Sequence, residues 1–120
     1  MSVEGIWTGE IYGPYGWENC GVYIIERGLM LGGNDQHYSA GSYSLDGKRI
    51  EADISGRFHG RPRTMFGQNR VEFDFTLSGE VEEGVIEGDI RSPSKPWSGV
   101  KCRFTKRKEI PKSEPLAEAC

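Results

Sequence analysis

The sequence has few cysteines and no long apolar run. Its three cysteines, Cys20, Cys102 and Cys120, form an odd set without close spacing, which excludes the paired spacing of a zinc site. No apolar run approaches the ~20 residues of a membrane-spanning helix. The first residues also lack the basic and apolar regions of a secretory signal. We therefore expect reduced thiols, a cytoplasmic protein and no membrane association.

Common enzyme motifs are missing as well. The sequence contains no P-loop and no G-x-G-x-x-G motif leading from a strand into a helix. His37 and His59 are the only histidines, and neither lies near a serine in a nucleophile elbow. Cys20 can form a thiol–imidazole pair only if the fold places a histidine beside it, and a small buried residue at the start of a strand is the simpler interpretation. The sequence predicts a protein with no catalytic residues, no metal and no cofactor.

What is present is an alternation of apolar and polar residues with a period of two, and no segment has a 3.6-residue period. Seventeen glycines are spread along the chain, and Asp46-Gly47 and Glu83-Gly84 are typical of tight hairpin turns. This pattern predicts an all-β fold, a single up-and-down antiparallel barrel of about eight short strands, because closure removes exposed strand edges. We expect the barrel over residues 1–106. The charged, proline-containing residues 107–120 are expected to be a disordered tail.

Two features of the expected barrel stay open at this stage. Small residues at inward positions (Gly9, Gly41, Ala52 and Gly88) either let strands bend or leave interior room. Residues 37–45 alternate on both faces, so the sequence does not decide whether Tyr38 or Tyr43 points inward. A short repeat, residues 50–54 and again 86–90, suggests two equivalent strands.

The start of the chain, Gly5-Ile6-Trp7, resembles the G-x-W of lipocalin-like barrels, in which the tryptophan closes one end. A longer stretch resembles the glycine-rich region of the GrlR-like family, and the likeness extends over about residues 3–106. It implies a small cytoplasmic regulator with a lipocalin-like barrel, a homodimer, and repression of type III secretion genes by binding a transcriptional activator. The residues that carry it are Cys20, Gly21, Ile24 or Ile25, Gly28, Met30, Gly32, Gly33, Asp35, Tyr38, Gly41 and Tyr43.

The sequence departs from that family at one loop. In the family's repressor, the loop after the Gly-Gly-Asp strand is strongly acidic and contributes to activator recognition. Here Leu45-Asp46-Gly47-Lys48 holds one acid and one base. A candidate substitute for it lies further along the chain, where residues 71–90 contain seven acids and no base: Glu72, Asp74, Glu80, Glu82, Glu83, Glu87 and Asp89.

The acidic segment has two interpretations. Either its acids pair with basic neighbouring strands, or its turn stays free at the rim and attracts a basic protein partner. The second interpretation makes Glu80, Glu82, Glu83 and Asp46 candidate partner-binding residues. Direct nucleic-acid binding is not predicted, because the net charge is −3 and DNA-binding domains carry a basic excess.

A different class of function is a lipocalin-like barrel that holds a small apolar or anionic ligand. The candidate pocket residues are then Trp7, Tyr23, Tyr38, Tyr43 and Phe73, with Arg57 at the mouth for an anionic group. A homodimer is expected from the resemblance and from Ile6 and Ile25, which we place on the outer face.

Overall fold

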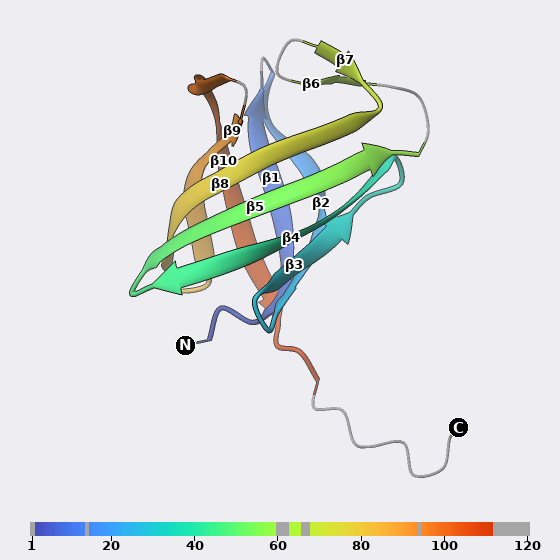
Figure 1. Ribbon diagram of the computed structural model, residues 1–120. Helices are drawn as coiled ribbons and strands as arrows, with labels where there is room; N and C mark the ends of the chain where they lie inside the picture. Colours follow the sequence, from blue (N-terminus) through green and yellow to red (C-terminus); the bar gives the residue numbers. More distant parts are fainter. Residues whose placement is uncertain (1, 14, 60–62, 66–67, 94, 112–120) are drawn as a thin grey trace, which may run out of the picture.

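The computed structural model describes residues 2–13, 15–59, 63–65, 68–93 and 95–111, without the side chains of 63–65, 68–70 and 95–98. Eight of its strands form one closed antiparallel barrel (Figure 1), in the order β1-β10-β9-β8-β5-β4-β3-β2. Their bounds are β1 Gly5–Gly13, β2 Gly16–Glu26, β3 Leu29–Gly33, β4 His37–Asp46, β5 Arg49–Phe58, β8 Glu72–Glu82, β9 Val85–Ser92 and β10 Lys95–Lys108.

The barrel closes because β1 pairs with β2 on one side and with β10 on the other. Each remaining strand pairs with its neighbours along the chain, apart from one insertion, so the predicted up-and-down barrel is confirmed. The insertion is a small hairpin, β6 (Arg63–Met65) and β7 (Gln68–Arg70), between β5 and β8. Sequence analysis missed this hairpin, because its strands are only three residues long and, apart from Met65, consist of polar or basic residues. β10 ends two residues beyond the predicted domain boundary, and the predicted tail from residue 112 on, Cys120 included, lies outside the described residues.

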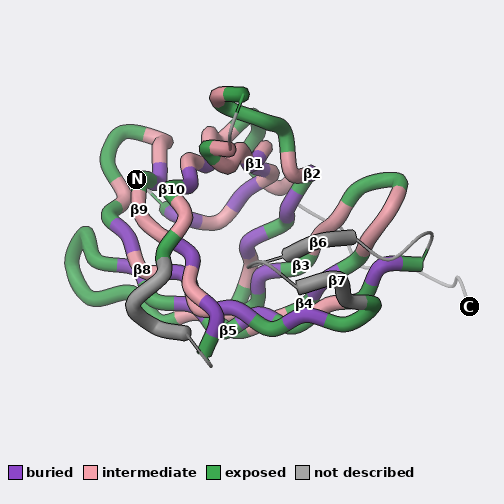
Figure 2. The backbone as a smooth tube through the Cα atoms, turned by 90° about the horizontal axis from the view of Figure 1, so that it is seen from above, coloured by how far each residue is buried: buried purple, intermediate pink, exposed green. Residues whose placement is uncertain are grey.

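The interior is formed by every second side chain of the strands, in keeping with the alternation in the sequence. Figure 2 shows buried and exposed segments alternating along the strands. In β1, β8, β9 and β10 the buried residues alternate with exposed or half-buried ones, as a period of two predicts; examples are Trp7, Phe75, Ile86 and Phe104. In β4 the structure decides between the two faces: Ser39 is buried and Tyr43 packs against the core, whereas Tyr38 is 55% exposed. The core residues include Trp7, Tyr23, Ile25, Met30, Ile50, Ile54, Phe73, Phe75, Leu77, Ile86, Ile90, Cys102 and Phe104.

Two inward glycines make room for aromatic rings from neighbouring strands. A Cβ on Gly9 would lie 2.6 Å from Cε2 of Phe104 and 2.9 Å from Sγ of Cys20, and a Cβ on Gly56 would overlap the ring of Phe73. These positions are therefore small because a ring already occupies the space beside them. The interior next to Gly9 is filled by side chains.

The repeated segments occupy equivalent places. Residues 50–54 lie in β5 and residues 86–90 in β9, and these two strands pair with opposite sides of β8. Leu77 of β8 lies between Ala52 of β5 and Ile90 of β9. The repeat thus corresponds to the two strands that flank β8, one on each side. The described part of the chain contains no helix long and apolar enough to cross a membrane.

Candidate functional site

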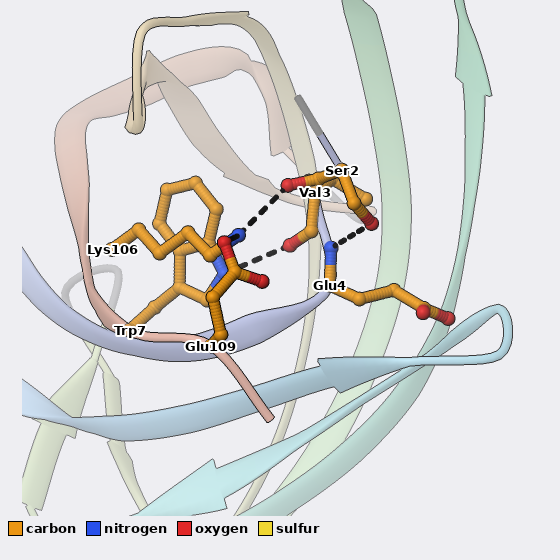
Figure 3. Close-up of polar contacts among 6 residues, drawn as sticks. All are labelled: Ser2, Val3, Glu4, Trp7, Lys106 and Glu109. Atoms are coloured by element: carbon orange, nitrogen blue, oxygen red, sulfur yellow. Dashed lines mark hydrogen bonds and ion pairs between the residues drawn. The ribbon is translucent and has the colours of Figure 1, made fainter. Parts of the chain in front are cut away.

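At one end of the barrel, the segment before β1 is bonded to Trp7 and to the end of β10 (Figure 3). Trp7 is fully buried, and its indole Nε1–H donates a hydrogen bond to the Val3 carbonyl at 2.9 Å. Beside it, the almost completely buried Lys106 donates from Nζ to the Ser2 carbonyl at 3.0 Å and pairs with Glu109 at 2.7 Å. Since these bonds tie the segment before β1 to the end of β10, this end is a fixed plug.

Three other candidate pocket residues point into the barrel, where they pack against protein. Tyr23 meets Phe104 edge-on, with ring centroids 5.3 Å apart, and its hydroxyl donates to the Cys20 carbonyl at 3.1 Å. Burial raises the pKa of the Tyr23 hydroxyl well above its usual range. The Phe73 ring lies 5.1 Å from that of Phe58, and Tyr43 packs against the core.

Tyr38 and Arg57 do not line the interior. Tyr38 lies on the outer face and stacks on His59, with ring centroids 6.2 Å apart. Arg57 also faces outward and forms an ion pair with Glu72. Both residues lie at outward-facing positions of their strands. Periodicity alone could not decide which of the β4 tyrosines, Tyr38 or Tyr43, faces the interior.

The two described cysteines are packed inside the wall formed by β1, β2 and β10. Burial raises the pKa of Cys20 from 9.0 to about 11 and that of Cys102 to about 12. Both thiols therefore carry their protons at neutral pH. His37 contacts the rings of Phe58 and Phe73. Among the described residues, no group of three or more His, Cys, Asp or Glu side chains is placed to hold a metal ion.

The candidate partner-binding residues lie together at the plugged end. The turn after β4 packs against the end of β8, because the Val81 N–H donates to the Lys48 carbonyl at 2.7 Å. Asp46 thus lies near the β8–β9 turn, whose Glu83 (φ 49°) and Gly84 (φ 79°) both adopt the left-handed backbone typical of tight hairpins. The outer side of this hairpin is an open groove of about 770 Å³. We call it the acidic groove, and its charged lining residues are Arg49, Glu80, Glu82, Glu83, Glu87, Asp89 and Arg91.

Both interpretations of the acidic segment apply, to different parts of it. Glu72 pairs with Arg57, and Asp89 lies 3.6 Å from Arg91, so these acids are paired on the barrel wall. Glu82, which the second interpretation leaves unneutralised, forms an ion pair with Lys48 at 3.2 Å, because the β4–β5 turn lies next to it.

Glu80 and Glu87 form no ion pair with any residue that the structure describes. They lie directly opposite each other across β8 and β9, an arrangement that is destabilising for like charges. The neighbouring bases are occupied elsewhere. Arg49, opposite Glu80, bonds to Glu51 and Ser78.

Arg103, opposite Glu87 on β10, is occupied in the same way. It pairs with Glu10 at 3.6 Å and lies 4.2 Å from the centroid of the Trp17 ring. Glu80 and Glu87 therefore form no ion pair among the described residues, although Arg49 and Arg103 lie opposite them on the neighbouring strands.

A second surface was missed by the sequence analysis. Val22, Ile24, Leu29, Leu31 and Tyr38 are 41–55% exposed and lie side by side on the outer faces of β2, β3 and β4. We call this surface the aliphatic wall. The sequence indicates this surface through the four consecutive apolar residues 22–25. Because neighbouring residues of a strand face opposite sides, this run makes the outer face of β2 apolar as well as the inner one.

The two isoleucines that we placed on the outer face have different positions. Ile6 is half-buried and pairs with Ile24 at the edge of the aliphatic wall. Ile25 is fully buried, so its assignment to the outer face is wrong. When both faces of a strand are apolar, the sequence pattern does not indicate which face is buried. The register with β1 and β3 then sets which residues point inward.

Comparison of the chain with family models and with curated proteins found no match.

Proposed function

We propose that this protein is a non-catalytic interaction module that binds a basic protein partner through the acidic groove. The observation that carries the proposal is the unrelieved pair Glu80 and Glu87. The free protein bears the repulsion of two facing carboxylates, and a Lys or Arg side chain of a partner placed between them relieves it. Association then gains from electrostatic steering as well.

The likeness to the GrlR-like family agrees with this role. In the family's repressor an acidic loop contributes to binding a transcriptional activator, and here the corresponding turn, which holds Asp46 and Lys48, lies against the β8–β9 hairpin. The acids have a different place in the sequence but the same end of the barrel. A transcriptional activator with a basic surface is accordingly the partner class we propose, with the protein acting as its regulator in the cytoplasm.

The alternative, a lipocalin-like carrier of a small ligand, has less support. Inward rings from β8 and β10 occupy the space beside Gly56 and Gly9, and Trp7 with Lys106 plugs one end. Two of the six candidate pocket residues face outward. A filled interior favours recognition on the outer surface.

We also propose that the aliphatic wall joins two copies of the chain. β3 contributes five residues, about 16 Å at ~3.3 Å each, and three strands at ~4.8 Å spacing give a width of about 10–14 Å. The resulting area of about 160–220 Å² is smaller than the largest apolar patch that a typical monomer exposes. A stable dimer buries about 800 Å² per partner, so the wall forms the apolar centre, with Thr8, Glu26 and Ser42 as its polar rim.

The partner proposal is tested by affinity capture from the source cells with mass-spectrometric identification, followed by binding of the purified partner. Reversing Glu80, Glu82 and Glu83 to Lys should abolish binding. The matched control reverses three exposed acids elsewhere, Glu18, Asp35 and Asp53, which changes the net charge equally. Binding that survives the first triple substitution, or that is lost equally in both, contradicts the acidic groove as the site.

The dimer proposal is tested by size-exclusion chromatography with light scattering. We expect twice the 13.4 kDa chain mass for the unmodified protein and the chain mass for Ile24→Lys/Leu31→Lys. The control Ser44→Lys/Ser55→Lys places the same charges at exposed positions of β4 and β5 and should stay dimeric. A monomer mass for the unmodified protein refutes the dimer.

A further inference from the structure

A cavity at the plugged end of the barrel is not used by either proposal above. Its volume is about 300 Å³, at the lower end of the range for binding pockets. We call it the foot pocket. Its lining residues come from the segment before β1, the β4–β5 turn and the β8–β9 hairpin: Ser2, Val3, Trp7, Leu45, Gly47, Lys48, Val81, Glu82, Glu83 and Gly84.

The foot pocket is apolar on one side and held in shape by hydrogen bonds. Val3, Trp7, Leu45 and Val81 supply its apolar lining. Three of the four are fixed by their surroundings, because Trp7 bonds to the Val3 carbonyl and the Val81 N–H bonds to the Lys48 carbonyl. Leu45 remains 44% exposed. A preformed apolar surface of this kind lowers the ordering cost of an incoming group.

The foot pocket adjoins the acidic groove, since Glu82 and Glu83 line both. A ligand that enters the pocket therefore continues into a groove whose lining has five acids and two bases. An extended segment matches this shape better than a compact small molecule. Charge complementarity requires cationic side chains next to the part that enters the pocket.

We infer that the foot pocket takes one large apolar side chain of a partner segment, and that the residues beside this anchor are Lys or Arg and lie in the acidic groove. The inference rests on the proposed function and specifies the chemistry of its partner. The anchor gains from burial against Val3, Trp7 and Val81. The cations neutralise Glu80 and Glu87.

Lys48 restrains this interaction. Its Nζ lies 3.2 Å from Oε1 of Glu82, at the junction of the foot pocket and the groove. A partner cation must displace Lys48 to reach Glu82. Removing the Lys48 charge therefore strengthens binding of a basic segment.

The test uses fluorescein-labelled acetylated hexapeptide amides, Gly-Leu-Gly-Lys-Arg-Lys and its reversed sequence, and measures Kd by anisotropy at low salt. The first comparison peptide replaces Leu by Ala, and the second replaces the three bases by Gln. Leu45→Ser removes part of the pocket lining. The matched control Leu29→Ser removes a leucine of similar exposure (49% against 44%) from the aliphatic wall.

We expect the Leu peptide in one of the two orientations to bind at least tenfold more tightly than its Ala counterpart. The gain should fall in Leu45→Ser and persist in Leu29→Ser, and both basic peptides should bind more tightly to Lys48→Gln. In ¹H–¹⁵N spectra the Leu peptide should shift the Trp7 indole resonance and the amides of Gly47 and Gly84.

The outcomes separate the two proposals. Equal binding of the Leu and Ala peptides, with both lost when Glu80 and Glu87 become Gln, overturns the anchor and leaves the acidic groove intact. A Leu-dependent gain that disappears in Leu29→Ser places the anchor on the aliphatic wall and also overturns the inference. If no basic peptide binds at millimolar concentration, both the inference and the proposed basic partner are refuted.

Discussion

The substitution Gly9→Ala tests whether the barrel is filled, which decides between an interaction module and a ligand carrier. The new Cβ would lie 2.6 Å and 2.9 Å from two atoms of the Phe104 ring and 2.9 Å from the Cys20 sulfur. Favourable carbon contacts need about 3.5–4.0 Å, so the ring or the strand must shift. Overpacking of a filled core costs about 1–3 kcal/mol, and we expect the free energy of unfolding to fall by that amount.

Gly13→Ala is the matched control on the same strand. Its Cβ would meet only the carboxylate end of Glu18, at 3.3 Å, which can rotate away. Neither glycine has a backbone conformation reserved for glycine, so the two variants differ in packing alone. We expect Gly13→Ala to change stability by no more than about 0.5 kcal/mol.

The assay is urea unfolding followed by tryptophan fluorescence. The double variant Gly9→Ala/Phe104→Leu should recover part of the loss, with a coupling energy of about 0.5–3 kcal/mol, because the smaller side chain vacates the position of the ring. If Gly9→Ala is as stable as Gly13→Ala, the interior has free space beside β1. The argument against a ligand-holding lumen then fails.

Three further predictions follow from the charges and buried groups. Glu87→Gln removes the repulsion with Glu80 and should stabilise the protein by about 0.2–1 kcal/mol, an effect that shrinks in a urea titration at high salt. Because burial raises the pKa of Cys20 from 9.0 to about 11 and of Cys102 to about 12, the folded state holds these protons more tightly. Stability should be greatest below pH 9 and fall as the pH rises toward about 11, less steeply in Cys20→Ala/Cys102→Ala, and a flat profile would contradict the burial of the thiols. Lys106→Met keeps the apolar stem but loses the bonds to Ser2 and Glu109, which should cost about 1–3 kcal/mol in urea unfolding and speed hydrogen exchange of the Trp7 indole. An unchanged exchange rate would show that the plug does not depend on Lys106.

The candidate site was only partly visible in the sequence. The acids of residues 80–83 were found because a run of like charge is a local feature. That Lys48 neutralises Glu82, and that Arg49 and Arg103 form bonds with Ser78 and Glu10 instead of Glu80 and Glu87, follows from contacts between residues distant in sequence. The foot pocket is a non-local feature for the same reason, since three separate segments form it.

The sequence by itself determined the strand content, the turns at Asp46-Gly47 and Glu83-Gly84, and the inward faces of β1, β8, β9 and β10. A period-two pattern with polar residues on one face has only one phase that buries the apolar face. Both faces are apolar in residues 22–25, and both are mixed in residues 37–45. In these segments the pattern does not indicate which face is buried. Only the closure of the barrel, with β2 between β1 and β3, decided that Ile25 is buried, that Ile24 and Tyr38 face outward, and that Asp46 and Glu82 share one end.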